Sequence, residues 1–132
     1  MYNKAKVEYH REQVSPFIVA HHVVSAVESE DGEIFTGFCI ESASGVMNLC
    51  AERVAALNMY MSTGKTRIRR LIACRENPPK NGGMPCGTCR EFLMQLDRAN
   101  GEMEILTDFE SRKTVKLKDV FPSWWGEKRY VE

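Results

Sequence analysis

The sequence has no surplus of charge of either sign. Its 132 residues contain 18 Lys and Arg against 18 Asp and Glu, so the formal net charge is zero. Proteins that bind duplex nucleic acid irrespective of sequence neutralise many phosphates with an excess of Lys and Arg. Nucleic acid is therefore not an expected partner.

Long apolar segments are also missing. No run approaches the roughly 18 consecutive apolar residues that a membrane-spanning helix needs, and residues 1–10 lack the apolar core of a signal peptide. We therefore expect a cytoplasmic protein that does not insert into membranes.

A complete disulfide framework is excluded by number. The five cysteines cannot all pair within one chain, and disulfides are rare in the reducing cytoplasm. We therefore expect some of these cysteines to carry chemistry.

The chain contains no repeat of fixed period, no low-complexity tract and no long Gly/Ser-rich linker. A chain of this length buries roughly two-thirds of its unfolded surface when it folds. The sequence therefore predicts residues 1–132 as a single domain with its own core.

The first half of the chain predicts a helix, a hairpin and a second helix. Residues 4–14 favour a charged helix that ends before Ser15-Pro16, because proline disfavours helix at the preceding residue. Residues 17–27 and 33–40 favour two strands joined by a turn at Asp31-Gly32. Residues 51–61 are apolar around the whole circumference, which predicts a buried helix that ends at Gly64.

The second half alternates in the same way. Residues 69–74 predict a strand, Asn77-Pro78-Pro79 through Gly82-Gly83 a loop, 89–96 a helix, 104–109 and 114–117 two short strands, and the region of Val120 a helical turn. This order favours the α/β class, with a three-layer α-β-α architecture and a mixed sheet of about five strands flanked by helices.

Two cysteine motifs stand at the predicted starts of two helices. They are Cys50-Ala51-Glu52 and Pro85-Cys86-Gly87-Thr88-Cys89. Helix N-termini lower thiol pKa values and favour the thiolates that bind metals. Three thiolates suit Zn²⁺ and leave its fourth position open for water, as in catalytic zinc sites. Glu52 is then the candidate general acid and base, and the guanidinium of Arg53 is a candidate donor to the thiolate sulfurs.

Two other interpretations of the cysteines remain open. The pair Cys86 and Cys89 alone also fits a redox motif, or half of a structural zinc site whose fourth ligand is Cys39, Cys74 or a histidine. The structural site predicts a zinc or binding module without turnover. Cys74 lies within an apolar segment and is expected to be a core residue.

Together, the two cysteine motifs resemble those of the cytidine deaminase superfamily, and most closely the small homotetrameric cytidine deaminases and blasticidin S deaminase. The resemblance covers nearly the whole chain. It implies that Cys50, Cys86 and Cys89 bind one Zn²⁺ per subunit, and that Glu52 moves a proton to the ring nitrogen and to the departing amine. The implied reaction converts cytidine or deoxycytidine to uridine or deoxyuridine and releases ammonia.

The resemblance is weaker at the residues that choose the substrate. The cytidine deaminases hold ribose hydroxyls with an Asn-x-Glu triplet, where this chain has Cys39-Ile40-Glu41. Cys39 and Glu41 are therefore candidate substrate contacts. Blasticidin S or another aminated heterocycle is the alternative substrate. Blasticidin S deaminase departs from the triplet differently, because it keeps the amide and loses the carboxylate, so this chain matches neither pattern completely.

The base-stacking phenylalanine of the family has no obvious counterpart. Counting back from Asp31-Gly32 without a gap places His21 at that position, with Phe17 as the candidate in another register. His22 would then face away, in a structural or surface role. Phe121, Trp124 and Trp125 are candidates to cap the core. The resemblance offers a second interpretation, in which Trp124 and Trp125 close the pocket of a neighbouring subunit in a homotetramer.

Overall fold

The computed structural model describes residues 1–75 and 83–131 of the chain. Its regular elements, in chain order, are α1 (Tyr2–Lys6), β1 (Glu12–Gln13), β2 (Ile18–Ser29), β3 (Ile34–Ser42), α2 (Ala51–Thr63), β4 (Ile68–Cys74), α3 (Gly87–Leu96), β5 (Glu104–Asp108), β6 (Lys113–Lys116) and α4 (Glu127–Val131). Three short 3₁₀ helices lie at Gly45–Met47, Arg98–Glu102 and Leu117–Val120.

Six strands form one mixed sheet. Strand β3 pairs along one side of β2, and on the other side β1 and β4 pair with the two ends of β2, all antiparallel. Strand β5 pairs parallel with β4, and β6 closes the sheet antiparallel to β5. The long strand β2 therefore organises half of the sheet and runs to the edge of the site described below.

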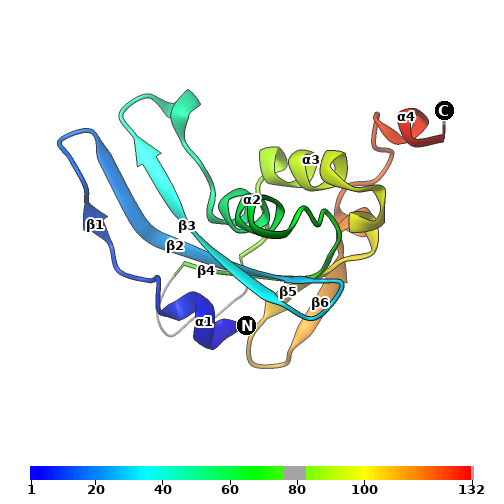
Figure 1. The fold of residues 1–132 in the computed structure, drawn as a ribbon, viewed down its shortest axis with the longest axis horizontal. Helices are drawn as coiled ribbons and strands as arrows, with labels where there is room; N and C mark the ends of the chain where they lie inside the picture. Colours follow the sequence, from blue (N-terminus) through cyan, green and yellow to red (C-terminus); the bar gives the residue numbers. More distant parts are fainter. Residues whose placement is uncertain (76–82, 132) are drawn as a thin grey trace.

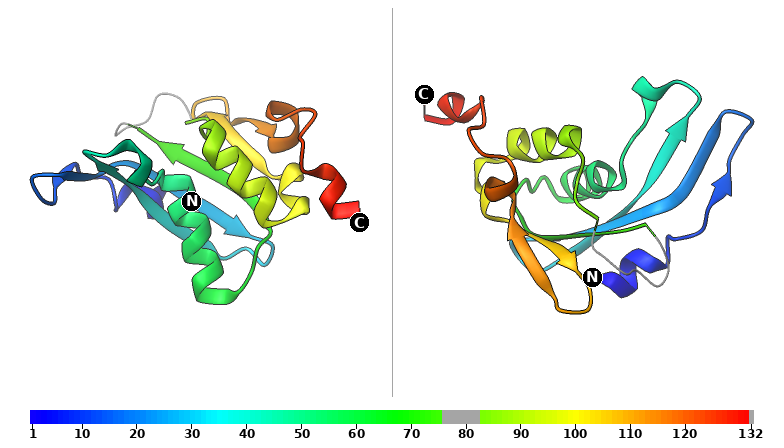
Figure 2. Two further views of the ribbon diagram at one scale, coloured as in Figure 1. Left: turned by 90° about the horizontal axis from the view of Figure 1, so that it is seen from above. Right: turned by 180° about the vertical axis from the view of Figure 1, so that it is seen from behind.

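Helices cover both faces of this sheet (Figure 1). Helices α2 and α3 lie on one face, over a core that includes Met59, Leu71, Leu93 and Ile105. The short helix α1 lies on the opposite face, where Ala5 belongs to a smaller buried cluster with residues of β2 and β4. The predicted three-layer α-β-α architecture is confirmed, and the two further views show α2 and α3 side by side (Figure 2).

The predicted hairpin and the end of the second helix are also confirmed. Gly32, in the β2–β3 turn, has a φ of 87°, and Gly64 ends α2 with a φ of 76°. Both angles fall in the left-handed region that glycine adopts without a steric penalty. These glycines fix the turn and the helix end that the sequence predicts.

Two predicted helices differ from the structure. The helix expected over 4–14 ends at Lys6, and Glu12–Gln13 instead forms β1 because its backbone pairs with β2. Helix α2 is not buried all round: Met61 is 82% exposed, whereas Ala55, Ala56 and Met59 are fully buried. Because the exposed outer face carries methionine and tyrosine, the sequence predicts more burial of this helix than the structure shows.

The predicted loop at Asn77-Pro78-Pro79 through Gly82 lies outside the described residues. Cys74 is buried as expected, at the end of β4. Across residues 1–75 and 83–131, none of the helices combines the length and the apolar character needed to cross a bilayer.

Candidate active site

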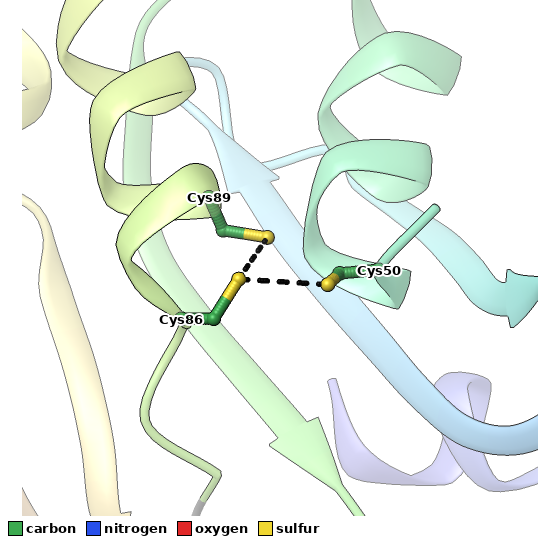
Figure 3. Close-up of side chains that lie close together, drawn as sticks. All are labelled: Cys50, Cys86 and Cys89. Atoms are coloured by element: carbon green, nitrogen blue, oxygen red, sulfur yellow. Dashed lines mark hydrogen bonds between the residues drawn. The ribbon is translucent and has the colours of Figure 1, made fainter. Parts of the chain in front are cut away.

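The three cysteines of the two motifs meet between the N-terminal ends of α2 and α3 (Figure 3). Cys50 is the N-cap residue of α2, Cys86 is the N-cap residue of α3, and Cys89 lies in the first turn of α3. The Sγ atom of Cys86 is 3.6 Å from that of Cys50 and 3.7 Å from that of Cys89. Two helix starts, 36 residues apart along the chain, thus supply one cluster.

The spacing of these sulfurs fits a bound metal ion. In a tetrahedral site with Zn–S bonds of about 2.3 Å, neighbouring sulfurs lie about 3.8 Å apart. The three Sγ atoms all lie within 4.8 Å of one another. They can therefore hold one metal ion without a rearrangement of the backbone.

The ionisation of the cysteines also favours a cation in the cluster. Burial opposes ionisation of Cys86, but the backbone groups of Cys89 and Thr88 and the thiol of Cys50 lower its pKa. Burial, followed by the negative charges of Glu52, Cys50 and Cys86, raises the pKa of Cys89. The negative charges around Cys89 thus oppose ionisation of its thiol, and a divalent cation bound to the sulfurs would relieve this repulsion.

Glu52 lies directly against the cluster, in the first turn of α2. Its side chain is only 2% exposed, and its Oε2 atom is 3.8 Å from the Sγ atom of Cys89. The other oxygen, Oε1, is buried without a hydrogen-bond partner. Burial raises the pKa of this carboxyl above its ordinary value, although Arg75, Cys89 and Arg53 oppose the shift. A buried carboxyl whose pKa is raised holds a proton more readily than a carboxyl in water, which suits a group that takes up and releases a proton.

Arg53 follows Glu52 and lies beside the same sulfurs. Its Nη2 atom donates to the backbone carbonyl of Asn48 at 3.1 Å. Burial opposes the charge on this guanidinium, but hydrogen bonds with Cys50 and Cys89 and their charges raise its pKa. This environment keeps one positive charge close to the thiolates.

A cavity of about 360 Å³ opens beside the cluster. Cys50, Glu52 and Cys86 line it together with Cys39 and Glu41 of β3. The structure therefore brings the two predicted substrate contacts of β3 to the same cavity as the cysteine cluster.

His21 lies elsewhere, so its expected place in the pocket is not what the structure shows. Its ring stacks on Phe38 and on His10, with centroid distances of 3.7 and 4.0 Å, and its Nδ1 atom is 2.7 Å from the carbonyl oxygen of Glu8. These partners lie on the α1 side of the sheet. The histidine that lines the cavity is His22.

A bulge in β2 causes this exchange of the two histidines. Ala20 pairs with Ile40 and Val24 pairs with Phe38, so three residues of β2 stand opposite Cys39 alone. His21, within this bulge, has a φ of 66°. A count back from the turn without a gap presupposes regular pairing. Because of the bulge, that count predicts His21 as the cavity residue, whereas His22 lines the cavity.

Phe17 and the two tryptophans also lie away from the cavity of their own chain. Phe17 is 70% exposed and follows the turn at Ser15 that precedes β2. The Nε1 atoms of Trp124 and Trp125 donate to the carboxylate of Glu91 on α3, at 2.8 and 2.6 Å. Trp125 remains 61% exposed. Both tryptophans thus lie beside α3, but Trp124 packs against the core, and only Trp125 is open to a neighbouring molecule.

Two ionisable residues of the cavity were missed by sequence reasoning. They are His22, which was assigned a structural or surface role, and Arg75, which lines the cavity and whose charge opposes the raised pKa of Glu52. His22 could have been found from the alternation of β2 only if the bulge had been known. Arg75 follows directly after β4, and its position at a strand end was the available signal.

Two known deaminases are similar to this chain in sequence. No family model matches the chain. Cytidine deaminase from Mycobacterium tuberculosis is 34% identical over 106 residues, which cover 79% of this chain and 72% of that protein. Blasticidin-S deaminase from Bacillus cereus is 31% identical over 81 residues, covering 55% and 56% of the two chains.

Solved structures agree on the fold. The crystal structure of cytidine deaminase from Mycobacterium tuberculosis superimposes with a TM-score of 0.70 at 24% identity, over 95% of this chain and 97% of that one. The identity and coverage of the sequence relatives, together with this shared fold, show that the chain belongs to the cytidine deaminase family.

Proposed function

We propose that this chain binds zinc at Cys50, Cys86 and Cys89 and deaminates a cytosine nucleoside, cytidine or deoxycytidine. Zinc-dependent hydrolytic deamination is the general activity of the family. The observation that carries the proposal is the buried Glu52 carboxyl, which lies 3.8 Å from the Cys89 sulfur and lines the same cavity as Cys50 and Cys86. A carboxyl without a metal-binding role, beside an open metal position, is the arrangement that hydrolytic deamination requires.

Bound zinc would supply Lewis acidity and a water activated near neutral pH. Glu52 takes the proton of the attacking water and delivers it to the ring nitrogen next to C4 of the cytosine. A carbon–oxygen bond forms at C4. The new C4 hydroxyl then gives its proton to Glu52, which passes it to the exocyclic amine as the carbon–nitrogen bond breaks and the C4 carbonyl forms. One water is consumed and one ammonia released, so the carboxyl returns to its starting state.

Arg53 supports these steps by balancing the charge of the thiolates. Three thiolates around Zn²⁺ carry a net charge of minus one, which would make a bound water less acidic. Arg53 contacts Cys50 and Cys89 and draws negative charge away from their sulfurs, which restores part of that acidity. Arg53 is therefore a positioning and charge-balancing residue in this proposal.

The test is a comparison of the wild type with Glu52→Gln. Both proteins should hold about one zinc per chain, because Glu52 is not among the three clustered donors. Ammonia release from cytidine should fall roughly 100-fold or more in the variant, because the proton carrier is lost. A wild type without zinc, or equal rates in the two proteins, would overturn the proposal.

Blasticidin S is the second candidate substrate. It is favoured by the relative named blasticidin-S deaminase. The triplet Cys39-Ile40-Glu41 does not decide between the two substrates, because blasticidin S deaminase keeps the amide and loses the carboxylate. Ammonia release from cytidine, deoxycytidine, blasticidin S and free cytosine, followed by the ultraviolet absorbance of each ring, separates the candidates. The substrate with the highest kcat/KM identifies the reaction.

A structural zinc or binding module is the rival without turnover. That role needs a fourth protein ligand, whereas the cluster formed by the described residues consists of three cysteines. Replacing zinc with Co²⁺ gives an absorbance spectrum that reports on the fourth position. A spectrum that changes when cytidine analogues are added supports an open position, and an unchanged spectrum supports the rival.

We also propose that the active form is a cytoplasmic homotetramer. The cytoplasm keeps thiols reduced, which suits five free cysteines, three of them in the metal cluster. In the assembly, the exposed Trp125 and its neighbour Trp124 would close a neighbouring subunit's cavity. Light scattering of the zinc-loaded protein measures the assembly, and a monomeric mass would contradict it.

A further inference from the structure

The imidazole of His22 is held at both of its nitrogens. Its Nδ1 atom is 3.3 Å from the Sγ atom of Cys39, and its Nε2 atom is 3.1 Å from the Oε2 atom of Glu41. The backbone N–H of Val23 donates to the same Sγ atom at 3.2 Å. One hydrogen-bond chain therefore runs from the backbone of β2 through a thiol and an imidazole to a carboxylate of β3.

The partners determine the direction of the hydrogen bonds in this chain. An ionised carboxylate only accepts, so the Nε2 atom of His22 carries the hydrogen and donates to Glu41. The Nδ1 atom then accepts from the thiol S–H of Cys39. Burial raises the pKa of this thiol and keeps its hydrogen in place. Each donor meets an acceptor, so the imidazole has a single favoured orientation.

The bulge in β2 makes the chain possible. His21 to Val23 stand opposite Cys39, and His22 turns towards β3 on the cavity side while His21 turns away. With regular pairing, one residue rather than three would face Cys39. A bulge that redirects a side chain towards a cavity is a recognised way to build a binding surface.

All three members of this chain line the cavity that also contains Glu52. We infer that His22 is a specificity-determining residue that holds the Glu41 carboxylate in place to accept a hydrogen bond from the N1 substituent of a cytosine-type substrate. The inference rests on the proposed function for the identity of the ring. It adds a positioning residue that the sequence assigned elsewhere.

The hydrogen bonds that join Cys39, His22 and Glu41, called the clamp below, restrict the substrates that the cavity favours. One oxygen of Glu41 is occupied by His22, and a carboxylate offers only acceptors to a ligand. Cys39 gives its hydrogen to His22, so this wall offers no donor where the related triplet has an amide. The N1 substituent must therefore supply the hydrogen itself, from a hydroxyl or a protonated amine.

The test uses equilibrium binding to zinc-loaded Glu52→Gln protein, in which bound substrate should persist. Cytidine carries hydroxyl donors on its N1 substituent, and 1-methylcytosine carries none. His22→Asn should weaken cytidine binding about tenfold or more, and 1-methylcytosine binding less than about twofold, because only cytidine uses the clamped carboxylate.

His22→Gln is the matched control. A glutamine amide lies near the position of Nε2 and keeps a donor for Glu41, whereas an asparagine amide lies near Nδ1 and does not. Glutamine should therefore retain most of the preference for cytidine. Unfolding temperature and zinc content of each variant check that the fold is intact.

A double-variant comparison separates positioning from a general structural effect. Glu41→Gln should lose the preference for cytidine, and adding His22→Asn should then cost less than about threefold more, because both residues act through one carboxylate. Equal weakening of both ligands, additive losses, or no binding of either ligand would overturn the inference.

Ammonia release by the same variants with Glu52 intact tests the proposed function separately. If the wild type released no ammonia while His22→Asn still weakened cytidine binding selectively, deamination would be wrong and the role of His22 would stand. If ammonia were released and His22→Asn changed neither binding nor KM, the role of His22 would be wrong and deamination would stand.

Discussion

Gly37 of β3 packs directly against the backbone of α2 at Ala55. A Cβ atom at position 37 would lie 2.4 Å from the backbone nitrogen of Ala55 and 2.7 Å from the carbonyl oxygen of Ala51. Only glycine permits this approach, because the opposing atoms belong to a helix backbone that cannot turn aside. The contact sets the height of α2 above the sheet, and with it the position of Cys50 and Glu52.

Gly37→Ala should therefore destabilise the fold. Forcing a methyl group into this contact should lower the free energy of unfolding by about 1 to 3 kcal/mol, measured by urea denaturation. Zinc affinity should fall as well, because α2 must move relative to α3. The control is Gly45→Ala, where a new Cβ atom meets nothing within 4 Å; equal losses at both positions would contradict this role for Gly37.

The position of the site was predictable from sequence because its determinants are local. Cys50 and Cys86 each follow a loop and occupy the N-cap position of a helix, and short motifs of this kind specify their own backbone. The meeting of the two helix starts then follows from the α/β architecture, in which both helices pack on one face of the sheet.

The wall of the pocket was not predictable in the same way. Whether His21 or His22 faces the cavity depends on a bulge opposite Cys39, which is a pairing between strands rather than a property of either one. Residues 4–14 illustrate the same point, because Glu12–Gln13 forms a strand only by pairing with β2. Such features depend on partners distant in sequence, and periodicity within one segment does not report them.

Asn100 ties the end of α3 to the start of β4. Its Oδ1 atom accepts from the backbone N–H of Ile68 at 2.7 Å, and its Nδ2 atom donates to the carbonyls of Thr66 and Leu93 at 3.0 and 2.9 Å. The residue is fully buried, so Asn100→Ala leaves several backbone groups unpaired. We expect a loss of roughly 2 to 4 kcal/mol in the free energy of unfolding.

Asn58 provides the comparison for this prediction. Its Nδ2 atom donates to the carbonyl of Thr36 at 3.1 Å, but the residue is exposed, so water can replace the lost partner. Asn58→Ala should therefore cost less than about 1 kcal/mol in the same urea experiment. A loss at Asn100 no larger than that at Asn58 would show that burial does not determine the effect.

Removing one sulfur should remove the metal. Cys86→Ala should reduce bound zinc from about one ion per chain to a small fraction of that, because two sulfurs remain. A chelator should lower the unfolding temperature of the wild type but leave that of the variant unchanged, since a ligand of the folded state stabilises it. Cys74→Ala, at a buried cysteine outside the cluster, should keep its zinc; loss of zinc there would contradict the assignment.

Glu52 should make the stability of the metal-free protein depend on pH. Burial raises its pKa in the folded state, so the folded protein holds the Glu52 proton more tightly than the unfolded chain, whose glutamates titrate near about 4.3. The contribution to stability is complete below that unfolded pKa and is lost as pH rises through the folded pKa.

Glu52→Gln carries no such proton and should not show this loss. In the presence of a chelator, urea denaturation should find the variant more stable than the wild type at pH 7, with the difference shrinking towards pH 4. A constant difference across this range would mean that Glu52 titrates alike in the folded and unfolded states, and its assignment as the buried proton carrier would then have to be abandoned.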